Sequence, residues 1–153
     1  MSLDPVVRTL RLPCRSDVAF TAFTDEIGQW WDARFSASGD ELAGVVMEDR
    51  LGGRLYEVSA DGVEHDWGIV TDRVPDRRIT LEWTLGLAPG TNSAVDVDFV
   101  DAIEGTGGTQ MRLEHGGWHE GQESDRAKFD DADGWSVLLS SYRRHIESEM
   151  SDR

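Results

Sequence analysis

The chain has 153 residues and six tryptophans, enough for a single domain that buries ~70% of its unfolded surface without disulfides or metals. Its 30 acidic residues outnumber its 15 basic residues and give a formal net charge of −15. A field of this sign repels phosphate backbones and anionic membranes, so we expect no nucleic-acid partner and no membrane partner. No signal peptide pattern opens the chain and no apolar run approaches ~20 residues, so we expect a cytoplasmic protein.

The N-terminal part predicts one strand followed by two short helices. Apolar and polar residues alternate over 6–12, and Pro13 ends that strand. Ser16 is a candidate cap for a first helix, and Thr24 is a candidate cap for a second over 25–31. The single cysteine, Cys14, lies between these elements and is interpreted as an ordinary thiol rather than a nucleophile.

Most of the chain between 41 and 115 predicts antiparallel strands, because apolar and polar residues alternate along short segments bounded by glycine or proline. The expected strands are 42–48, 54–60, the segment from 63 up to Pro75, 78–85, 95–99 and 109–115. Polar segments at 36–40 and 86–92 are expected to be loops, and 105–108 a turn.

Asp61-Gly62 predicts a two-residue type I′ hairpin, which fixes the register of the two strands around it. The predicted opposite pairs are Ala60 with Val63, Val58 with His65, Tyr56 with Trp67, and Arg54 with Ile69. This register buries one face of the hairpin and leaves Glu57 on the other. The predicted buried face carries Tyr56, Val58, Val63, Trp67 and Ile69, with Arg54 and His65 as its polar members.

The last helix is expected to begin at Gly134 and to lie on the sheet. Its apolar residues recur at helical spacing and form one stripe, which a lone helix cannot bury. The stripe consists of Trp135, Leu138, Leu139, Tyr142 and Ile146. The acidic segment 116–133 before it predicts a short helix at 124–129, and it is either a functional lid or a solvated loop.

Seven short motifs, in this order along the chain, resemble those of one known family. They are Trp30-Trp31, Gly52-Gly53-Arg54, Trp67-Gly68-Ile69-Val70 leading to Pro75, Leu81-Glu82-Trp83, Gly108-Thr109, Leu113-Glu114-His115 and Gly134-Trp135. Over roughly residues 6–146 the chain resembles the SRPBCC superfamily (START-like, Bet v1-like), and within it the group of activator of Hsp90 ATPase homologue 1-like domains.

The resemblance implies an α+β helix-grip fold, in which a curved antiparallel sheet wraps around the long C-terminal helix and a cavity lies between them. We expect residues 1–153 to form one such domain, with its core at about 6–148. The leading hypothesis is a protein with no established catalytic activity that binds a small apolar or aromatic ligand in a mainly apolar cavity. The residues expected to line it are Trp31, Arg54, Tyr56, Trp67, Ile69, Leu81, Trp83, Val97, Phe99, Met111, Leu113, His115, Trp135, Leu138, Leu139 and Tyr142. Whether the aromatic side chains line this space or fill it stays open.

Two alternatives accompany the leading hypothesis. A polyketide cyclase-like or hydrolase-like enzyme would use His65 or His115 as its acid or base, since histidine titrates near neutrality. The alternative for each histidine is a structural role, as a hydrogen-bonded residue at a strand end. An interaction module, including an Hsp90-type co-chaperone, is the third hypothesis, although 153 residues leave no room for the N-terminal domain of the eukaryotic co-chaperone. A homodimer is left open.

The sequence favours neither a metal site nor a cofactor. His115 and His119 have the spacing of a helical metal pair, but Gly116-Gly117 argues against a helix there. The segment 129–140 has Phe129 and Ser140 where a calcium loop needs its first and last ligands. No glycine-rich phosphate loop precedes a helix.

Overall fold

The structure is a computed structural model that describes residues 3–101 and 108–151. The predicted turn at 105–108 therefore lies mostly outside the described residues. Within them, seven strands form one antiparallel sheet in the order β1-β7-β6-β5-β4-β3-β2. The strands are β1 (Val6–Leu12), β2 (Leu42–Met47), β3 (Arg54–Ser59), β4 (Glu64–Val74), β5 (Arg78–Trp83), β6 (Ser93–Asp101) and β7 (Thr109–Gly116).

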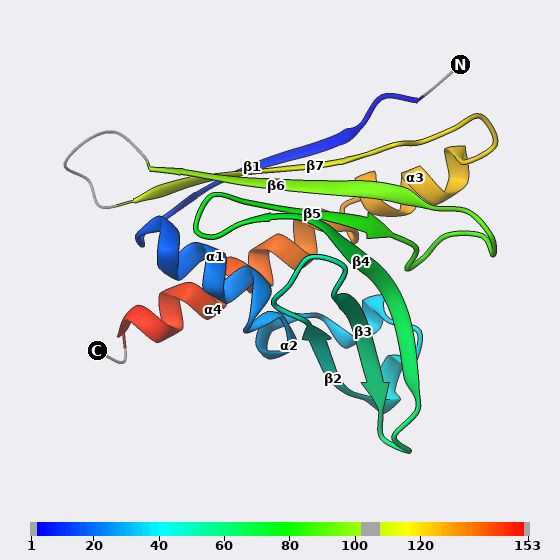
Figure 1. The fold of residues 1–153 in the computed structure, drawn as a ribbon, viewed down its shortest axis with the longest axis horizontal. Helices are drawn as coiled ribbons and strands as arrows, with labels where there is room; N and C mark the ends of the chain where they lie inside the picture. The colour runs from blue at the N-terminus through cyan, green and yellow to red at the C-terminus, as the bar shows by residue number, and fades with distance from the viewer. Residues whose placement is uncertain (1–2, 102–107, 152–153) are drawn as a thin grey trace.

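The helices lie against the concave face of this sheet, with β4 bending strongly around them (Figure 1). They are α1 (Ser16–Thr24), α2 (Ile27–Trp30), α3 (Glu123–Asp130) and α4 (Trp135–Ser151), with short 3-10 turns η1 (Ala33–Phe35) and η2 (Gly39–Glu41). The predicted helix-grip arrangement and the predicted short helix in 116–133 are confirmed. None of the helices in the described part of the chain has the length and apolar character that crossing a membrane requires.

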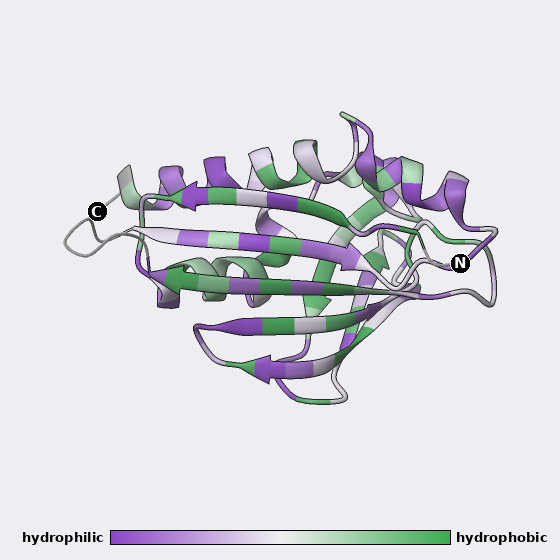
Figure 2. Ribbon diagram, turned by 90° about the horizontal axis from the view of Figure 1, so that it is seen from above, coloured by the Kyte–Doolittle hydropathy of each residue, from purple (hydrophilic) through white to green (hydrophobic). Residues whose placement is uncertain are grey.

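The stripe predicted for α4 is its buried face, because Trp135, Leu138, Tyr142 and Ile146 are fully buried. Apolar and polar residues alternate along the strands, as Figure 2 shows in green and purple. One face of the sheet thus meets α4 and the other meets solvent. Tyr142 completes the contact by donating its hydroxyl hydrogen to the carbonyl oxygen of Ala19, at 2.7 Å, which ties α4 to α1.

The second helix is shorter than predicted, and Thr24 does not cap it. Thr24 is the last residue of α1, and its hydroxyl donates to the carbonyl oxygen of Phe20 one turn back, at 2.8 Å. A threonine hydroxyl bonded in this way is not available to an N-terminal amide. The next helix therefore begins only at Ile27.

The predicted register of the β3–β4 hairpin is wrong for most of its length. The loop has three residues rather than two: the amide of Ser59 donates to the carbonyl of Val63, and Gly62 alone in the loop has a positive φ, of 86°. A three-residue loop that ends in a left-handed glycine shifts the pairing by one residue. Tyr56 consequently pairs with Asp66, Glu57 with His65 and Val58 with Glu64.

The one-residue shift turns the predicted faces of β3 over. Leu55 and Glu57 are fully buried, whereas Val63 is 48% exposed. An irregularity between Leu55 and Tyr56 then restores the predicted pairing of Arg54 with Ile69, and Trp67 faces inward as predicted.

Glu57 is thus a carboxylate inside the protein, and three donors surround it. The amides of Ala37 and Ser38 lie 2.7 and 2.9 Å from its two oxygens, and the indole nitrogen of Trp67 lies 2.6 Å away. Burial alone would raise the pKa of Glu57, but hydrogen bonds from Ser38, Ala37 and Trp67 outweigh it and lower the pKa below the usual 4.5. The carboxylate therefore fastens the segment between η1 and η2 to the sheet.

Replacing Glu57 with Gln should lower the free energy of unfolding at neutral pH by about 1–3 kcal/mol, because an amide NH2 would face an N–H donor. The folded pKa is depressed, so the stabilisation is complete above the unfolded pKa of 4.5 and disappears as pH falls below it. Urea denaturation from pH 7 to pH 3 should show a shallower acid slope for the variant. Glu41→Gln, at an exposed position, is the control, and equal slopes for all three proteins would contradict this role.

Candidate functional site

Aromatic side chains fill the space between the sheet and the start of α4. The ring centroid of Trp31 lies 4.8 Å from Trp67, 6.0 Å from Trp83 and 6.1 Å from Trp135, and Trp83 lies 5.4 Å from Trp135. Trp67, Trp83 and Trp135 are no more than 1% exposed. We call these four residues the tryptophan cluster. They come from β4, β5, α4 and the residue that follows α2, so their contacts join the sheet to the helices and stabilise the helix-grip fold.

His115 lies beside this cluster with both ring nitrogens engaged. The indole N–H of Trp135 donates to Nδ1 at 3.0 Å. Because Nδ1 accepts, the ring proton belongs on Nε2, which lies 2.7 Å from the hydroxyl oxygen of Ser93. That hydroxyl in turn donates to the carbonyl oxygen of Trp83 at 3.2 Å. Every polar group in this series of hydrogen bonds thus has a partner, and the series requires a neutral imidazole.

Neither His115 nor Cys14 has the properties of a reactive group. His115 is fully buried, and this burial lowers its pKa from 6.5 to about 3. Burial first, and then the charges of Asp17 and Glu149, raises the pKa of the Cys14 thiol to about 11. The structural reading of His115 as a hydrogen-bonded residue therefore accounts for its position.

The structure brings most of the predicted cavity residues together in the interior. The buried ones are Trp31, Trp67, Leu81, Trp83, Val97, Phe99, Met111, Leu113, His115, Trp135, Leu138, Leu139 and Tyr142. They pack against one another and against aromatic residues that the prediction did not include, among them Trp118 and Phe129, both fully buried. Trp118 donates its indole N–H to the carbonyl oxygen of His115 at 2.7 Å.

The prediction that Arg54, Tyr56, Ile69 and His65 face the interior is wrong. Ile69 is 43% exposed and His65 is exposed at the start of β4. The guanidinium of Arg54 lies 4.2 Å from the ring centroid of Tyr56 and bonds Asp66 at 2.6 Å. For Arg54 and Tyr56 the cause is the hairpin register, which turns β3 over. Ile69 faces outward because Trp67 is an extra residue on β4 at the irregularity, and this moves Ile69 to the opposite face from Trp67.

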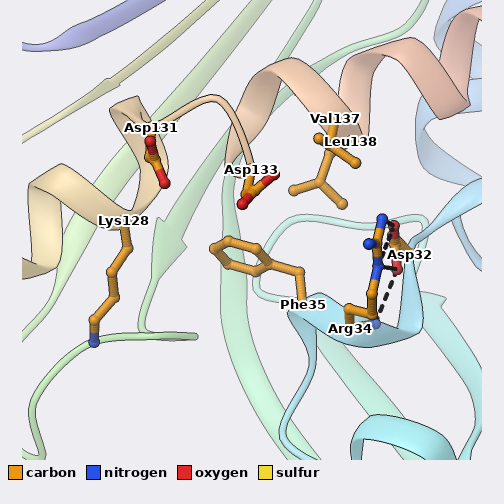
Figure 3. A pocket seen from close by; sticks show the side chains of 8 residues that line it. All are labelled: Asp32, Arg34, Phe35, Lys128, Asp131, Asp133, Val137 and Leu138. Carbon is orange, nitrogen blue, oxygen red and sulfur yellow. Dashed lines mark hydrogen bonds and ion pairs between the residues drawn. The ribbon is translucent and has the colours of Figure 1, made fainter.

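A pocket of about 330 Å³ opens where η1 faces the corner between α3 and α4. Its residues are Asp32, Arg34, Phe35, Lys128, Asp131, Asp133, Val137 and Leu138, and Figure 3 shows them converging from the two sides. Three apolar side chains, Phe35, Val137 and Leu138, lie among charged ones. We call this the corner pocket. A second pocket of about 240 Å³ shares Arg34, Phe35 and Lys128 with it and extends to Leu85 and Gly86.

Phe35 separates the corner pocket from the aromatic interior. Its ring centroid lies 5.1 Å from that of Phe129, and Phe129 lies 4.5 Å from His115 and 6.3 Å from Trp83. The indole N–H of Trp31 donates to the carbonyl oxygen of Phe35 at 2.8 Å. The pocket floor is therefore continuous with the tryptophan cluster.

The charges at the rim are unevenly neutralised. Asp32 binds the guanidinium of Arg34 through both oxygens, and this hydrogen bond lowers the pKa of Asp32. Lys128 lies 3.3 Å from Asp125 and 3.0 Å from the carbonyl oxygen of Gly86. Asp131 and Asp133 are exposed, and no salt bridge is found for either within the described part of the chain. The rim therefore has an excess of negative charge.

Gly134 makes the corner between α3 and α4 sharp enough to form this pocket. A Cβ at this position would lie 2.4 Å from the carbonyl oxygen of Phe129 and 2.5 Å from that of Lys128. The two helices can therefore approach only without a side chain here.

Little in the sequence indicates this pocket. Phe35 and Asp32 belong to a three-residue 3-10 turn and its cap, and Lys128 and Asp131 lie at the end of a short helix. No periodic pattern relates the two segments. The acidic segment 116–133 was the only indication, through its prediction as either a lid or a solvated loop.

The family model described as activator of Hsp90 ATPase homolog 1-like protein matches residues 14–147. The chain belongs to this family. The SRPBCC resemblance of the seven motifs is thereby confirmed. A comparison with curated proteins gives no match.

Solved structures show the same fold. CalC from Micromonospora echinospora, a self-sacrificing resistance protein, is 24% identical with a TM-score of 0.72, covering 95% of this chain and 96% of that one. The anthrahydroquino-gamma-pyrone synthase Txn09 is 23% identical with a TM-score of 0.59, covering 94% and 97%. The Aha1 dimer from Colwellia psychrerythraea is 16% identical with a TM-score of 0.66, covering 95% and 97%. At these identities the likeness shows the fold alone.

His115 should remain neutral, with its proton on Nε2, from pH 6.5 down to about pH 3. Its folded pKa is depressed, so its contribution to stability is complete above 6.5 and disappears as pH falls toward 3, where the unfolded chain takes up a proton first. Ring nitrogen chemical shifts measured by NMR report the tautomer directly. His119→Gln, at an exposed position, should leave these signals unchanged. An imidazolium signal for His115 in the folded protein at pH 5 would refute the assignment.

Gly134→Ala should lower the free energy of unfolding by about 1–3 kcal/mol, because backbone oxygens of α3 must move away from the new methyl group. Gly44→Ala is the matched control, since a Cβ at Gly44 has nothing within 4 Å and no positive φ is found there. Urea denaturation compares the two variants. Equal stability of both would show that the corner between α3 and α4 does not depend on the glycine.

Proposed function

We propose that this protein binds a small aromatic molecule, neutral or positively charged, in the corner pocket. One observation carries the proposal: an apolar floor formed by Phe35, Val137 and Leu138 lies within a charged rim in a pocket of about 330 Å³. That volume lies in the range of small-molecule sites, and a mainly apolar surface with a few polar groups is their usual lining. Phe35 offers an aromatic ligand a ring that already packs on another aromatic residue.

Charge favours a neutral or cationic ligand over an anionic one. The ion pairs of Asp32 with Arg34 and of Asp125 with Lys128 largely cancel, which leaves Asp131 and Asp133 at the rim. The net charge of −15 adds a repulsive field for anions. Txn09 is by its printed name the synthase of an anthrahydroquino-gamma-pyrone, and an aromatic ligand for the present chain is in keeping with that name.

A binding role suits the geometry better than an acid-base enzyme does. Both histidines that the enzyme hypothesis relies on are unsuited, since His115 is sealed in the interior and His65 is exposed away from the pocket lining. The proposal therefore concerns a small molecule.

The test uses two tricyclic probes of similar size and opposite charge, 9-aminoacridine and 9-anthracenecarboxylate. Binding can be followed by tryptophan fluorescence, because Trp31 and its neighbours lie just below Phe35. The cation should bind more tightly than the anion, because Asp131 and Asp133 lie at the rim of the pocket. The double variant Asp131→Asn, Asp133→Asn should weaken binding of the cation roughly fivefold and should not weaken binding of the anion. Phe35→Ala should weaken the binding of both probes.

Asp49→Asn changes an exposed carboxylate outside the pocket lining and serves as the control for net charge. Native mass spectrometry would count the probe molecules bound per chain. Binding that is unaffected by Phe35→Ala, or a preference for the anion, would overturn the proposal.

A further inference from the structure

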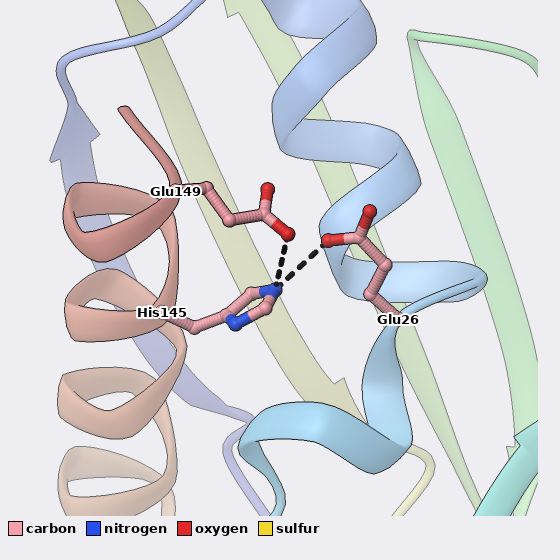
Figure 4. Close-up of side chains that lie close together, drawn as sticks. All are labelled: Glu26, His145 and Glu149. Atoms are coloured by element: carbon pink, nitrogen blue, oxygen red, sulfur yellow. Dashed lines mark hydrogen bonds and ion pairs between the residues drawn. The ribbon is translucent and has the colours of Figure 1, made fainter. Parts of the chain in front are cut away.

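Three side chains that can bind a metal meet at the other end of α4, away from the corner pocket. Nε2 of His145 lies 2.8 Å from Oε1 of Glu26 and 3.1 Å from Oε1 of Glu149. One donor atom from each residue lies within 4.8 Å of the others. Figure 4 shows His145 and Glu149 projecting from α4 toward Glu26, which lies in the turn between α1 and α2. No local pattern in the sequence indicates this cluster, because Glu26 is 119 residues from His145.

The fold holds these donors in place. His145 and Glu149 are four residues apart on one helix, so both side chains occupy the same face. The side chain of His145 is only 12% exposed, and those of Glu26 and Glu149 are 25% and 32% exposed. Partly buried donors from two separate elements that converge in this way resemble a prepared set of ligands more than mobile surface side chains.

The charges around the cluster favour a cation. Two carboxylates lie within 3.1 Å of one imidazole nitrogen in a protein of net charge −15. A pocket of about 170 Å³ adjoins them, lined by Asp17, Val18, Thr21, Glu26 and Glu149, with neither lysine nor arginine in that lining. Asp17 in this lining is 46% exposed, and its Oδ2 accepts a hydrogen bond from Arg15 at 3.2 Å.

We propose that Glu26, His145 and Glu149 bind one divalent transition-metal ion, Zn²⁺ in the first instance. Zinc takes imidazole nitrogen and carboxylate oxygen at about 2.0–2.2 Å, and tetrahedral ligands at that distance are about 3.4 Å apart. The present N···O separations need to open by only a few tenths of an ångström, roughly, to reach that value. Zn²⁺ binding requires Nε2 without its proton, so the neutral imidazole carries its one ring proton on Nδ1, and a displaced proton passes to water.

The donor set selects against the commoner cations. Calcium and magnesium prefer sites made only of oxygen, so the imidazole disfavours both. Three protein ligands leave one position of a tetrahedral zinc ion for water, and the adjoining pocket has room for it. With the imidazole neutral, two carboxylates balance the charge of the ion. The metal would join the C-terminal half of α4 to the turn between α1 and α2, and so stabilise the packing of these helices.

The experiment is calorimetric titration of the metal-free full chain with ZnCl2, together with its thermal melting temperature. We expect one Zn²⁺ per chain and a rise in the melting temperature, since a ligand bound only by the folded state stabilises it. Mg²⁺ and Ca²⁺ at the same concentration should have no effect. His145→Gln, Glu26→Gln and Glu149→Gln should each weaken Zn²⁺ binding at least ~10-fold.

Matched controls separate this site from adventitious zinc. Glu147→Gln removes an exposed carboxylate from the same helix, and His65→Gln and His119→Gln remove exposed imidazoles; all three should bind Zn²⁺ as the wild type does. Should a glutamine variant fold poorly by circular dichroism, Glu149→Asp keeps the charge and moves the ligand back by one methylene, and it should also weaken binding. The visible spectrum of bound Co²⁺ should change in the ligand variants only. Absence of stoichiometric Zn²⁺ binding, or binding that His145→Gln leaves intact, would overturn the proposal.

Discussion

Trp135 is the contact through which the long helix is joined to the sheet. It is the first residue of α4, its ring packs in the tryptophan cluster, and its indole N–H begins the chain of hydrogen bonds through His115 and Ser93 to the carbonyl oxygen of Trp83. This chain links α4 to β7, β6 and β5 in turn. Each donor in it has an acceptor, so the polar atoms remain satisfied at full burial. Without it, an imidazole between aromatic rings would be an unpaired polar group in an apolar interior.

The elements that could be predicted are those set by local periodicity. The stripe of α4 and the alternation along β5 and β7 need no knowledge of distant residues, since the period of the pattern alone identifies the element and its buried face. The β3–β4 hairpin shows where this fails. Asp61-Gly62 is compatible with a two-residue loop and with a three-residue loop that ends at Gly62, and the two differ by one residue in register. One residue is sufficient to exchange the faces of a strand, so Glu57 was placed outside and Arg54 inside.

The candidate site was harder to predict than the core, for a related physical reason. The aromatic interior is built on strands and on α4, where alternation reveals which side chains face inward. The corner pocket is built on a 3-10 turn and the end of a short helix, and Phe35 and Lys128 meet only because the tertiary structure brings η1 to the start of α4. The buried carboxylate of Glu57 contributes to this from a distance, since it holds the segment that follows η1. Such contacts have no sequence period from which they could be inferred.

The closed interior also explains why the ligand is sought at the corner between α3 and α4. An aromatic guest placed between sheet and helix would have to separate rings that lie 4.8–6.3 Å apart and break a chain of satisfied hydrogen bonds, and both changes oppose folding. At the corner, by contrast, Phe35 is half-buried and the α3–α4 junction turns at Gly134, so a guest can add to the aromatic stack from outside. Under the proposed function, the loop residues of this corner, more than those of the core, determine the ligand.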